Sequence, residues 1–173
     1  LAGGWIDQPW VSEVYPGSVV VAQIWPDMDF DYRSGLATSS RECAIKLWGN
    51  RYPEGVPEEN AKLLFGAENP PGTKYVSGSQ DHLGLLMPGI NRLYYSGGYW
   101  PDKIDSTVDP SVCEWLSEVI HLVKLTPRPE GYDPLKEMHL EPSFVRELGE
   151  AGNLCWESIQ RKDIMGLGKS MTD

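Results

Sequence analysis

Short apolar stretches separated by glycine and proline run along this chain, and several of them predict β-strands. Residues 18–25 (SVVVAQIW) are rich in β-branched side chains and predict a buried strand that ends at Pro26. Residues 28–32 (MDFDY) alternate apolar and acidic side chains, as a half-exposed strand paired with the first would do. Residues 90–100 alternate similarly before a Gly-Gly turn, and residues 120–127 (IHLVKLTP) predict a further strand.

Other segments repeat their apolar residues at the spacing of an α-helix. In residues 40–49 (SRECAIKLWG), Cys43, Leu47 and Trp48 share one helical face with either Ile45 or Ala44, and Gly49 ends the helix. Because strands and helices follow one another in mixed order, the pattern favours an α+β fold over a doubly wound sheet. Further helices are predicted at 57–68, 82–89 and 109–119, and one or two more at 142–171.

Composition limits the class of protein. The 173 residues are 40% hydrophobic, which is enough for one compact domain, or one and a half, with a buried core. The net charge of −10 would repel a nucleic-acid backbone, although backbone amides can still bind phosphate locally. We therefore expect no nucleic-acid partner.

Cysteine use and hydropathy favour a cytoplasmic location. Cys43, Cys113 and Cys155 are dispersed without a CxxC pair, which indicates a reducing interior and makes structural zinc improbable. No apolar run approaches the length of about 20 residues that crosses a bilayer, and no signal peptide is visible, so we expect no membrane partner. Because the chain begins with Leu1 and ends within a helical pattern, we expect a fragment of a longer protein.

The segment SGLATSS, directly before the helix at 40–49, is the first candidate for chemistry. Small residues let the backbone approach a ligand closely, and the N–H groups at a helix start can hold phosphate oxygens. A simpler interpretation is that Ser39 or Ser40 only caps the helix. The candidate loop consists of Ser34, Gly35, Leu36, Ala37, Thr38, Ser39 and Ser40.

Three motifs in order give the chain a resemblance to a known family. They are LAGGWID at 1–7, SGLATSS at 34–40 and SGSQDHLG at 77–84. The chain resembles the GHMP kinase superfamily, and within it the fucokinase and heptose kinase branch. Those proteins carry a segment like LAGGWxD, a loop of the form GSGLG[ST]SSA and a later Gln-Asp-Gln in a glycine-rich turn. The similarity continues to the C-terminal residues and so covers most of the chain.

The resemblance implies roles for individual residues. The loop from Ser34 to Ser40 would surround the phosphates of ATP, with the Ser39 hydroxyl directed at Mg²⁺ and Glu68 as the second metal ligand. Asp81 would be the catalytic base that orients the attacking hydroxyl and accepts its proton. The simpler alternatives are a surface acid at a helix end for Glu68 and a helix cap for Asp81.

The resemblance also places the substrate. Asp7 would accept hydrogen bonds from the hydroxyls of a small-molecule sugar, with Gly4 and Gly78 beside it, although Asp7 could instead cap a turn. Trp5 and Trp10, together with Tyr99, could offer flat faces to a sugar ring, but the tryptophans are expected to be mostly core.

Several positions depart from the family pattern. Arg33 and Ala37 replace loop glycines, and we expect Ala37 to lose access to positive φ. Arg41 replaces an alanine and could pair with phosphate, and His82 replaces the second glutamine of the later motif. Asp7 and Ser34 are only 27 positions apart, so the chain is either a compact member of the family or a non-catalytic relative.

The sequence therefore predicts an ATP-dependent kinase that phosphorylates a sugar hydroxyl, with the anomeric hydroxyl of a deoxyhexose or heptose as the expected acceptor. The alternatives are a pseudokinase that binds sugar or nucleotide without transfer and, last, a glycoside hydrolase or lectin-like module built on Asp7 and Asp81. The resemblance implies the GHMP kinase fold with a left-handed β-α-β crossover, an N-terminal domain at 1–101 and an incomplete C-terminal domain at 102–173. The sequence does not indicate the oligomeric state.

Overall fold

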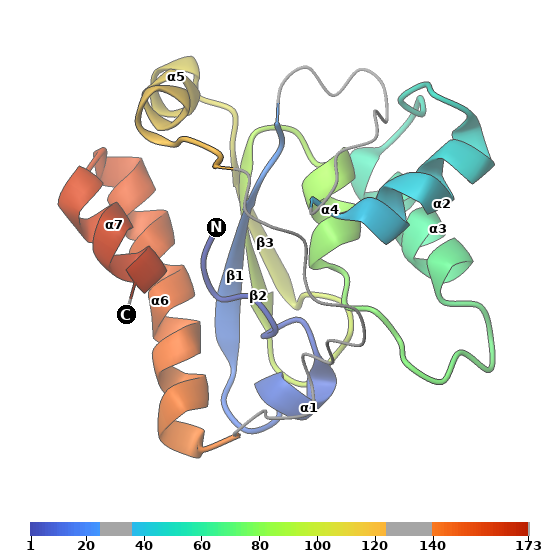
Figure 1. The fold of residues 1–173 in the computed structure, drawn as a ribbon, viewed down its shortest axis with the longest axis horizontal. Helices are drawn as coiled ribbons and strands as arrows, with labels where there is room; N and C mark the ends of the chain where they lie inside the picture. The colour runs from blue at the N-terminus through green and yellow to red at the C-terminus, as the bar shows by residue number, and fades with distance from the viewer. Residues whose placement is uncertain (25–35, 124–139, 173) are drawn as a thin grey trace.

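The computed structural model describes residues 1–24, 36–123 and 140–172, and it has a mixed α+β fold (Figure 1). The fold class predicted from the sequence is therefore confirmed at this level. The strands within these residues are β1 (Gly17–Ala22), β2 (Ile90–Tyr95) and β3 (Lys103–Thr107). The helices are α1 (Pro9–Ser12), α2 (Thr38–Trp48), α3 (Pro57–Glu68), α4 (Gln80–Leu86), α5 (Pro110–Val119), α6 (Pro142–Arg161) and α7 (Ile164–Thr172).

The strands form an antiparallel sheet in the order β1-β2-β3. Gly17 pairs with Tyr95 and Ala22 with Ile90, so β1 and β2 match over their full length. The connection between these two strands contains α2, α3 and α4. Residues 96–102 connect β2 to β3, which pairs with β2 and lies at the edge of the sheet. An ion pair joins Lys103 and Asp105 on β3 at 2.8 Å.

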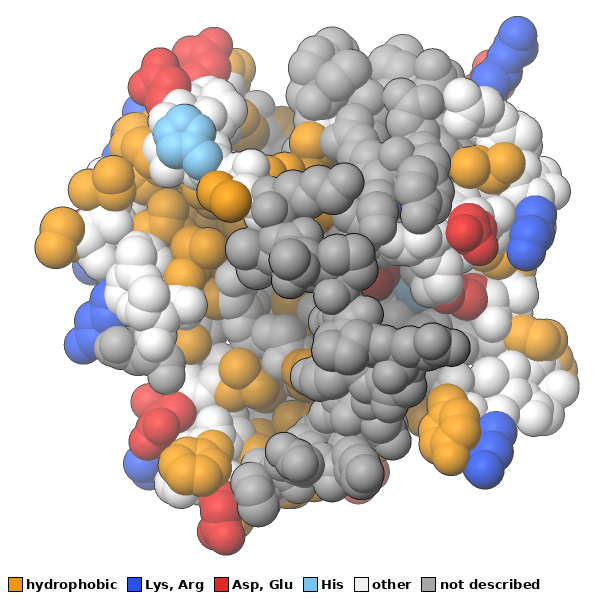
Figure 2. All heavy atoms as spheres, viewed as in Figure 1, with side chains coloured by type: hydrophobic (Ala, Val, Ile, Leu, Met, Phe, Trp, Pro, Cys, Tyr) orange, Lys and Arg blue, Asp and Glu red, His pale blue; other side chains and the backbone are white. Residues whose placement is uncertain are grey.

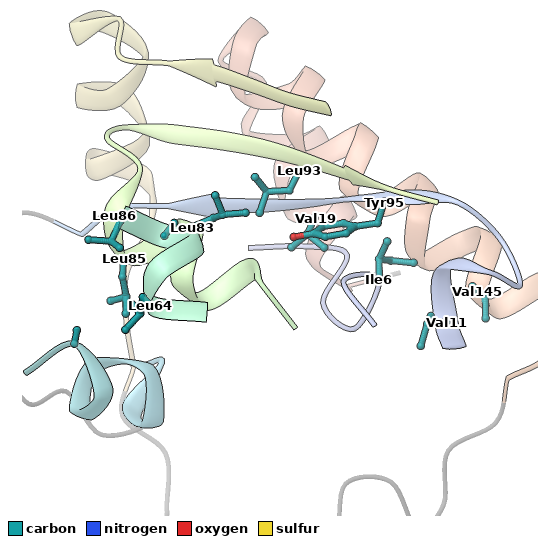
Figure 3. Close-up of a cluster of buried hydrophobic side chains, with 12 residues drawn as sticks. Ile6, Val11, Val19, Leu64, Leu83, Leu85, Leu86, Leu93, Tyr95 and Val145 are labelled. Atoms are coloured by element: carbon teal, nitrogen blue, oxygen red, sulfur yellow. The ribbon is translucent and has the colours of Figure 1, made fainter. Parts of the chain in front are cut away.

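Successive residues of a strand point to opposite sides of the sheet. Apolar residues at neighbouring positions of β1 therefore pack against helices on both faces. Val19 belongs to a core cluster with Leu83 of α4 and Leu64 of α3, and Figure 3 shows their side chains between these helices and the strands. The next residue, Val20, belongs to a second cluster with Cys155 and Ile159 of α6. The sheet is therefore the middle layer, with α2 to α4 on one side and α5 to α7 on the other (Figure 1).

Glycines allow α6 to lie directly against β1. A Cβ on Gly152 would overlap the backbone carbonyl of Ser18, and a Cβ on Gly149 would lie 3.0 Å from the Cα of Gly17. The Ser18 hydroxyl also donates a hydrogen bond of 2.9 Å to Oδ1 of Asn153. This close approach fixes α6 on the strand by backbone contact as well as by apolar packing.

The outer side of the α5 to α7 layer keeps many apolar side chains exposed, and Figure 2 shows them gathered on that side of the molecule. Met165 of α7 is the most exposed of them, at 80% of its full surface, and Phe144 of α6 is 57% exposed. The second core cluster is therefore covered by helices that are themselves only partly buried.

Most predicted elements agree with the structure, and the differences have local causes. The helix predicted at 57–68 has those bounds, and the strand predicted at 18–25 ends at Ala22. The strand predicted at 120–127 is wrong where it can be compared, because residues 121–123 have no regular structure; residues 124–127 lie outside the described part. The strand predicted at 28–32 also lies outside it.

The described strands pair only in antiparallel fashion, whereas a β-α-β crossover joins parallel strands. The expected left-handed crossover therefore has no counterpart within residues 1–24, 36–123 and 140–172. The domain boundary predicted near Asp102 falls between β2 and β3, which pair with each other. The division into two domains stays a prediction.

We expect Gly152→Ala to destabilise the protein by about 1–3 kcal/mol, because the new methyl group forces α6 away from Ser18. Gly66→Ala is the matched control. Gly66 lies within helix α3, and a methyl group added there would meet open space, so alanine should add about 0.5–1 kcal/mol of stability. Urea denaturation of the two variants measures both effects, and equal stabilities would contradict the close α6–β1 contact.

Candidate functional site

A cavity of about 870 Å³ lies where the start of α2, helices α4 and α5, and strands β1 and β2 meet. Its polar lining includes Arg41 of α2 together with Gln80 and Asp81 of α4. Its apolar lining includes Leu116 and Ile120 on the α5 side. The cavity therefore brings Leu36 and Ala37, which directly precede α2, and Asp81 of α4 to one space.

Ala37 precedes α2 in the left-handed conformation, with φ 51° and ψ 42°. The prediction that alanine would not adopt positive φ here is therefore wrong. The conformation costs about 1–3 kcal/mol for a non-glycine residue, and local hydrogen bonds support it. The Arg41 amide donates to the carbonyl of Ala37 at 2.9 Å, and Arg41 Nε donates to the carbonyl of Leu36 at 3.1 Å.

A left-handed residue followed by helical ones turns successive backbone N–H groups toward a common point, which suits an anion. Leu36 and Ala37 line the cavity, and Thr38 begins α2. Ser34 and Gly35, the first two residues of the predicted loop, lie outside the described residues. The N-cap of α2 is Ala37, so neither Ser39 nor Ser40 caps this helix.

The carboxylate of Glu68 at the end of α3 accepts hydrogen bonds from two other helices. Ser40 Oγ of α2 donates to Oε2 at 2.6 Å, and His82 Nε2 of α4 lies 2.7 Å from the same oxygen. Ser39 also hydrogen-bonds to this carboxylate. Burial would raise the pKa of Glu68, but the bonds from His82, Ser40 and Ser39 together outweigh it and lower the pKa to about 2.

The two predicted metal ligands, Ser39 and Glu68, are thus brought together, with Ser40 beside them. A hydroxyl and a carboxylate are the oxygen donors that Mg²⁺ takes in proteins, so the chemistry of these residues fits that ion. No group of three or more His, Cys, Asp or Glu side chains suited to a metal ion occurs within the described residues.

Asp81 is the second residue of α4, and its side chain reaches the cavity. Asp81 is solvent-exposed, but partial desolvation of its carboxyl group by the cavity walls raises its pKa; His82 and Arg41 oppose the rise, and the charge of Glu68 adds to it. The N-cap of α4 is Ser79, so the simpler interpretation, in which Asp81 caps this helix, is wrong. The backbone N–H of Gln80 donates to Oδ2 of Asp7 at 3.2 Å.

Asp7 is 2% exposed and lies against Gly78, where a Cβ would overlap its carboxylate. Only glycine therefore fits at position 78. Gly4 lies three residues upstream, with no atom close to a side-chain position. Asp7 and Gly78 are thus neighbours at the start of α4. The role of Asp7, Gly4 and Gly78 toward a substrate stays a prediction.

Burial raises the pKa of Asp7 to about 6; the Gln80 hydrogen bond opposes this rise, and the charge of Asp81 adds to it. Trp5, two residues earlier, has φ 77° and is 40% exposed, with its ring centroid 6.1 Å from that of Trp10. The two rings are tilted by 54° and so present no common flat face. Tyr99 packs against Phe65 instead, with centroids 6.2 Å apart.

Two features of the site could not be derived from the sequence. The bond between Glu68 and His82 joins residues on different helices, and their spacing of 14 positions matches no helical or strand repeat. The buried hydroxyl pair of Ser79 and Tyr95, 2.8 Å apart beneath α4, likewise gives no sequence signal. Both depend on how α3, α4 and β2 pack.

Comparison of the chain with known protein families, with curated proteins and with solved structures finds no match in any of the three. Within residues 1–24, 36–123 and 140–172, no helix has both the length and the apolar composition needed to cross a membrane. The residues of the site and the motif resemblance are therefore the basis on which a function can be inferred.

We expect the stability of the protein to fall as the pH rises from about 4 to about 6. The folded state keeps the proton of Asp7 up to a pKa of about 6, whereas an unfolded chain releases it near 3.8, so the folded state binds more protons in this range. Each unit of difference between the folded and unfolded pKa of Asp7 corresponds to about 1.36 kcal/mol of unfolding free energy. Asp7→Asn should therefore reduce the decline in unfolding free energy by up to about 3 kcal/mol.

Urea denaturation at several pH values between 4 and 7 measures the effect for the wild type and Asp7→Asn. Far-ultraviolet circular dichroism at pH 4 checks that the variant folds. Parallel stability curves for the two proteins over this range would show that burial does not perturb Asp7.

Proposed function

We propose that this protein transfers the terminal phosphoryl group of ATP to a hydroxyl of a sugar, as a kinase of the GHMP type. One observation carries the proposal: Asp81 and the left-handed start of α2 line the same cavity. Phosphoryl transfer needs an anion-binding backbone and a carboxylate near the attacking hydroxyl, and few other reactions need both in one space.

The start of α2 is the proposed phosphate site. Leu36, Ala37 and Arg41 line the cavity, and the eleven residues of α2 add the partial positive charge of a helix N-terminus. The guanidinium group of Arg41, which replaces an alanine of the family pattern, can pair with phosphate oxygens. The proposed ATP-binding loop runs from Ser34 to Ser40.

Ser39, Ser40 and Glu68 would hold Mg²⁺. Their hydroxyl and carboxylate oxygens already lie within hydrogen-bond distance of one another. When bound, Mg²⁺ neutralises charge on the phosphates. The low pKa of Glu68 keeps this carboxylate ionised at neutral pH, which a metal ligand requires.

Asp81 is the proposed catalytic base. Its carboxylate lines the cavity, and its raised pKa makes it a stronger proton acceptor than an aspartate of ordinary pKa. Asp7, with Gly4 and Gly78, is the proposed sugar-binding group at the start of the same helix. The proposal includes the GHMP kinase fold, with domains at 1–101 and 102–173, and a cytoplasmic location.

We expect Asp81→Asn to lower kcat for phosphate transfer by about 10²- to 10⁴-fold, because the amide cannot accept the proton of the attacking hydroxyl. Binding of Mg-ATP should change little. Transfer from ATP is measured across a panel of free deoxyhexoses and heptoses. Asp102→Asn, at an exposed carboxylate outside the cavity, is the control and should keep wild-type activity.

Absence of transfer by the wild type to any sugar of the panel would contradict the kinase proposal. So would a wild-type rate in Asp81→Asn, because the proton must then leave by another route.

A second candidate is a pseudokinase that binds sugar or nucleotide without transfer. The arrangement of Glu68 favours it, because Oε2 already accepts hydrogen bonds from Ser40 and His82. Calorimetry separates the two candidates. Magnesium-dependent ATP binding supports the kinase, and sugar binding that is indifferent to Mg-ATP supports the pseudokinase.

A further inference from the structure

His82 follows Asp81 in α4, and its side chain is completely buried. Nε2 lies 2.7 Å from Oε2 of Glu68, which accepts the Ser40 hydroxyl at 2.6 Å. One carboxylate oxygen thus joins α2, α3 and α4. The imidazole is the α4 member of this junction.

The direction of the hydrogen bond follows from the charge of Glu68. An ionised carboxylate only accepts hydrogen bonds, so His82 Nε2 carries the hydrogen and donates it. The other ring nitrogen, Nδ1, is buried and has no hydrogen-bond partner among the described residues. Phe65 packs edge-on against the ring, with centroids 5.3 Å apart.

A histidine is an unfavourable choice for a site that requires only packing. The unpaired Nδ1 loses its hydration without a replacement bond, and an apolar side chain of similar volume would avoid that loss. What the imidazole supplies in return is a single donor directed at Glu68. The side chain therefore serves the orientation of the carboxylate more than the packing of the core.

We propose that His82 is a positioning residue that holds the carboxylate of Glu68 toward the hydroxyls of α2, in the orientation needed for a magnesium-bound nucleotide. This inference rests on the proposed function. Residues that hydrogen-bond to metal-ligating carboxylates fix their orientation, and their loss commonly weakens metal affinity by about 10- to 100-fold.

The test compares His82→Leu, which removes the donor, with His82→Gln, whose side-chain amide can donate to Glu68. ATP binding is measured by calorimetry while Mg²⁺ is titrated, and again with the metal chelated. We expect the Mg²⁺ concentration for half-maximal effect to rise about 10- to 100-fold in His82→Leu and to recover to within a few-fold of wild type in His82→Gln. Metal-free ATP binding should be equal in all three proteins.

Two outcomes would overturn the inference. In one, His82→Leu keeps the wild-type magnesium dependence. In the other, both variants lose metal-free and metal-dependent binding equally, as a general packing defect would cause. Failure of the proposed function looks different, because the wild type itself would then show no magnesium-dependent ATP binding.

Urea denaturation of His82→Leu, Glu68→Ala and the double variant, without any ligand, checks folding and the pair itself. Non-additive losses of stability would show that the two side chains interact in solution. Additive losses would overturn the proposal, because no bond would then connect His82 to Glu68.

Discussion

The hydrogen bonds to Oε2 of Glu68 help to fix the position of α2, together with the apolar packing of Cys43 and Trp48 against the core. Of the side chains that α2 buries, Ser40 and Arg41 are polar and only Ala44 is apolar. Apolar burial and these polar contacts therefore act together on this helix. Hydrogen bonds to an ionised carboxylate are among the stronger ones, and here they connect α2 to α3 and α4.

The sheet gives this junction a rigid support. Val19 and Leu93 pack under α4, while Val20 on the reverse face packs under α6, which approaches β1 through Gly149 and Gly152. Leu83 and Leu86 pack into the core and so fix α4 on the sheet. Asp81, near the start of this helix, therefore lines the cavity at a defined position. The acidic group thus belongs to a framework element rather than to a loop.

The sequence predicts the elements with strong local signals and misses those that depend on distant contacts. The helix at 57–68 is marked by a proline and early acids, and the structure has the same bounds. β3 has the polar sequence KIDST and is held by pairing with β2, so no local pattern predicts it. The apolar run at 120–123 lacks a strand partner in the described structure, and its β-propensity is therefore not realised.

The same distinction applies to the site. The motif resemblance predicts that Glu68 and Asp81 belong to the same site. In the structure they lie on α3 and α4, two helices that contact each other. It could not indicate that Ala37 adopts a left-handed conformation, since this depends on the bonds that Arg41 makes around it. Nor could it indicate the bond from His82 to Glu68, which exists only once α3 and α4 pack together.

The charges on β3 have a consequence for self-association. Among the residues that the structure describes, no strand pairs with the outer side of β3. Lys103 and Asp105 form an ion pair on this strand, and Arg92 of β2 also bonds to Asp105. A second sheet added at this edge would have to strip water from these groups. Charged side chains on an edge strand disfavour pairing with a further strand, so the charges on β3 oppose edge-to-edge association of two sheets.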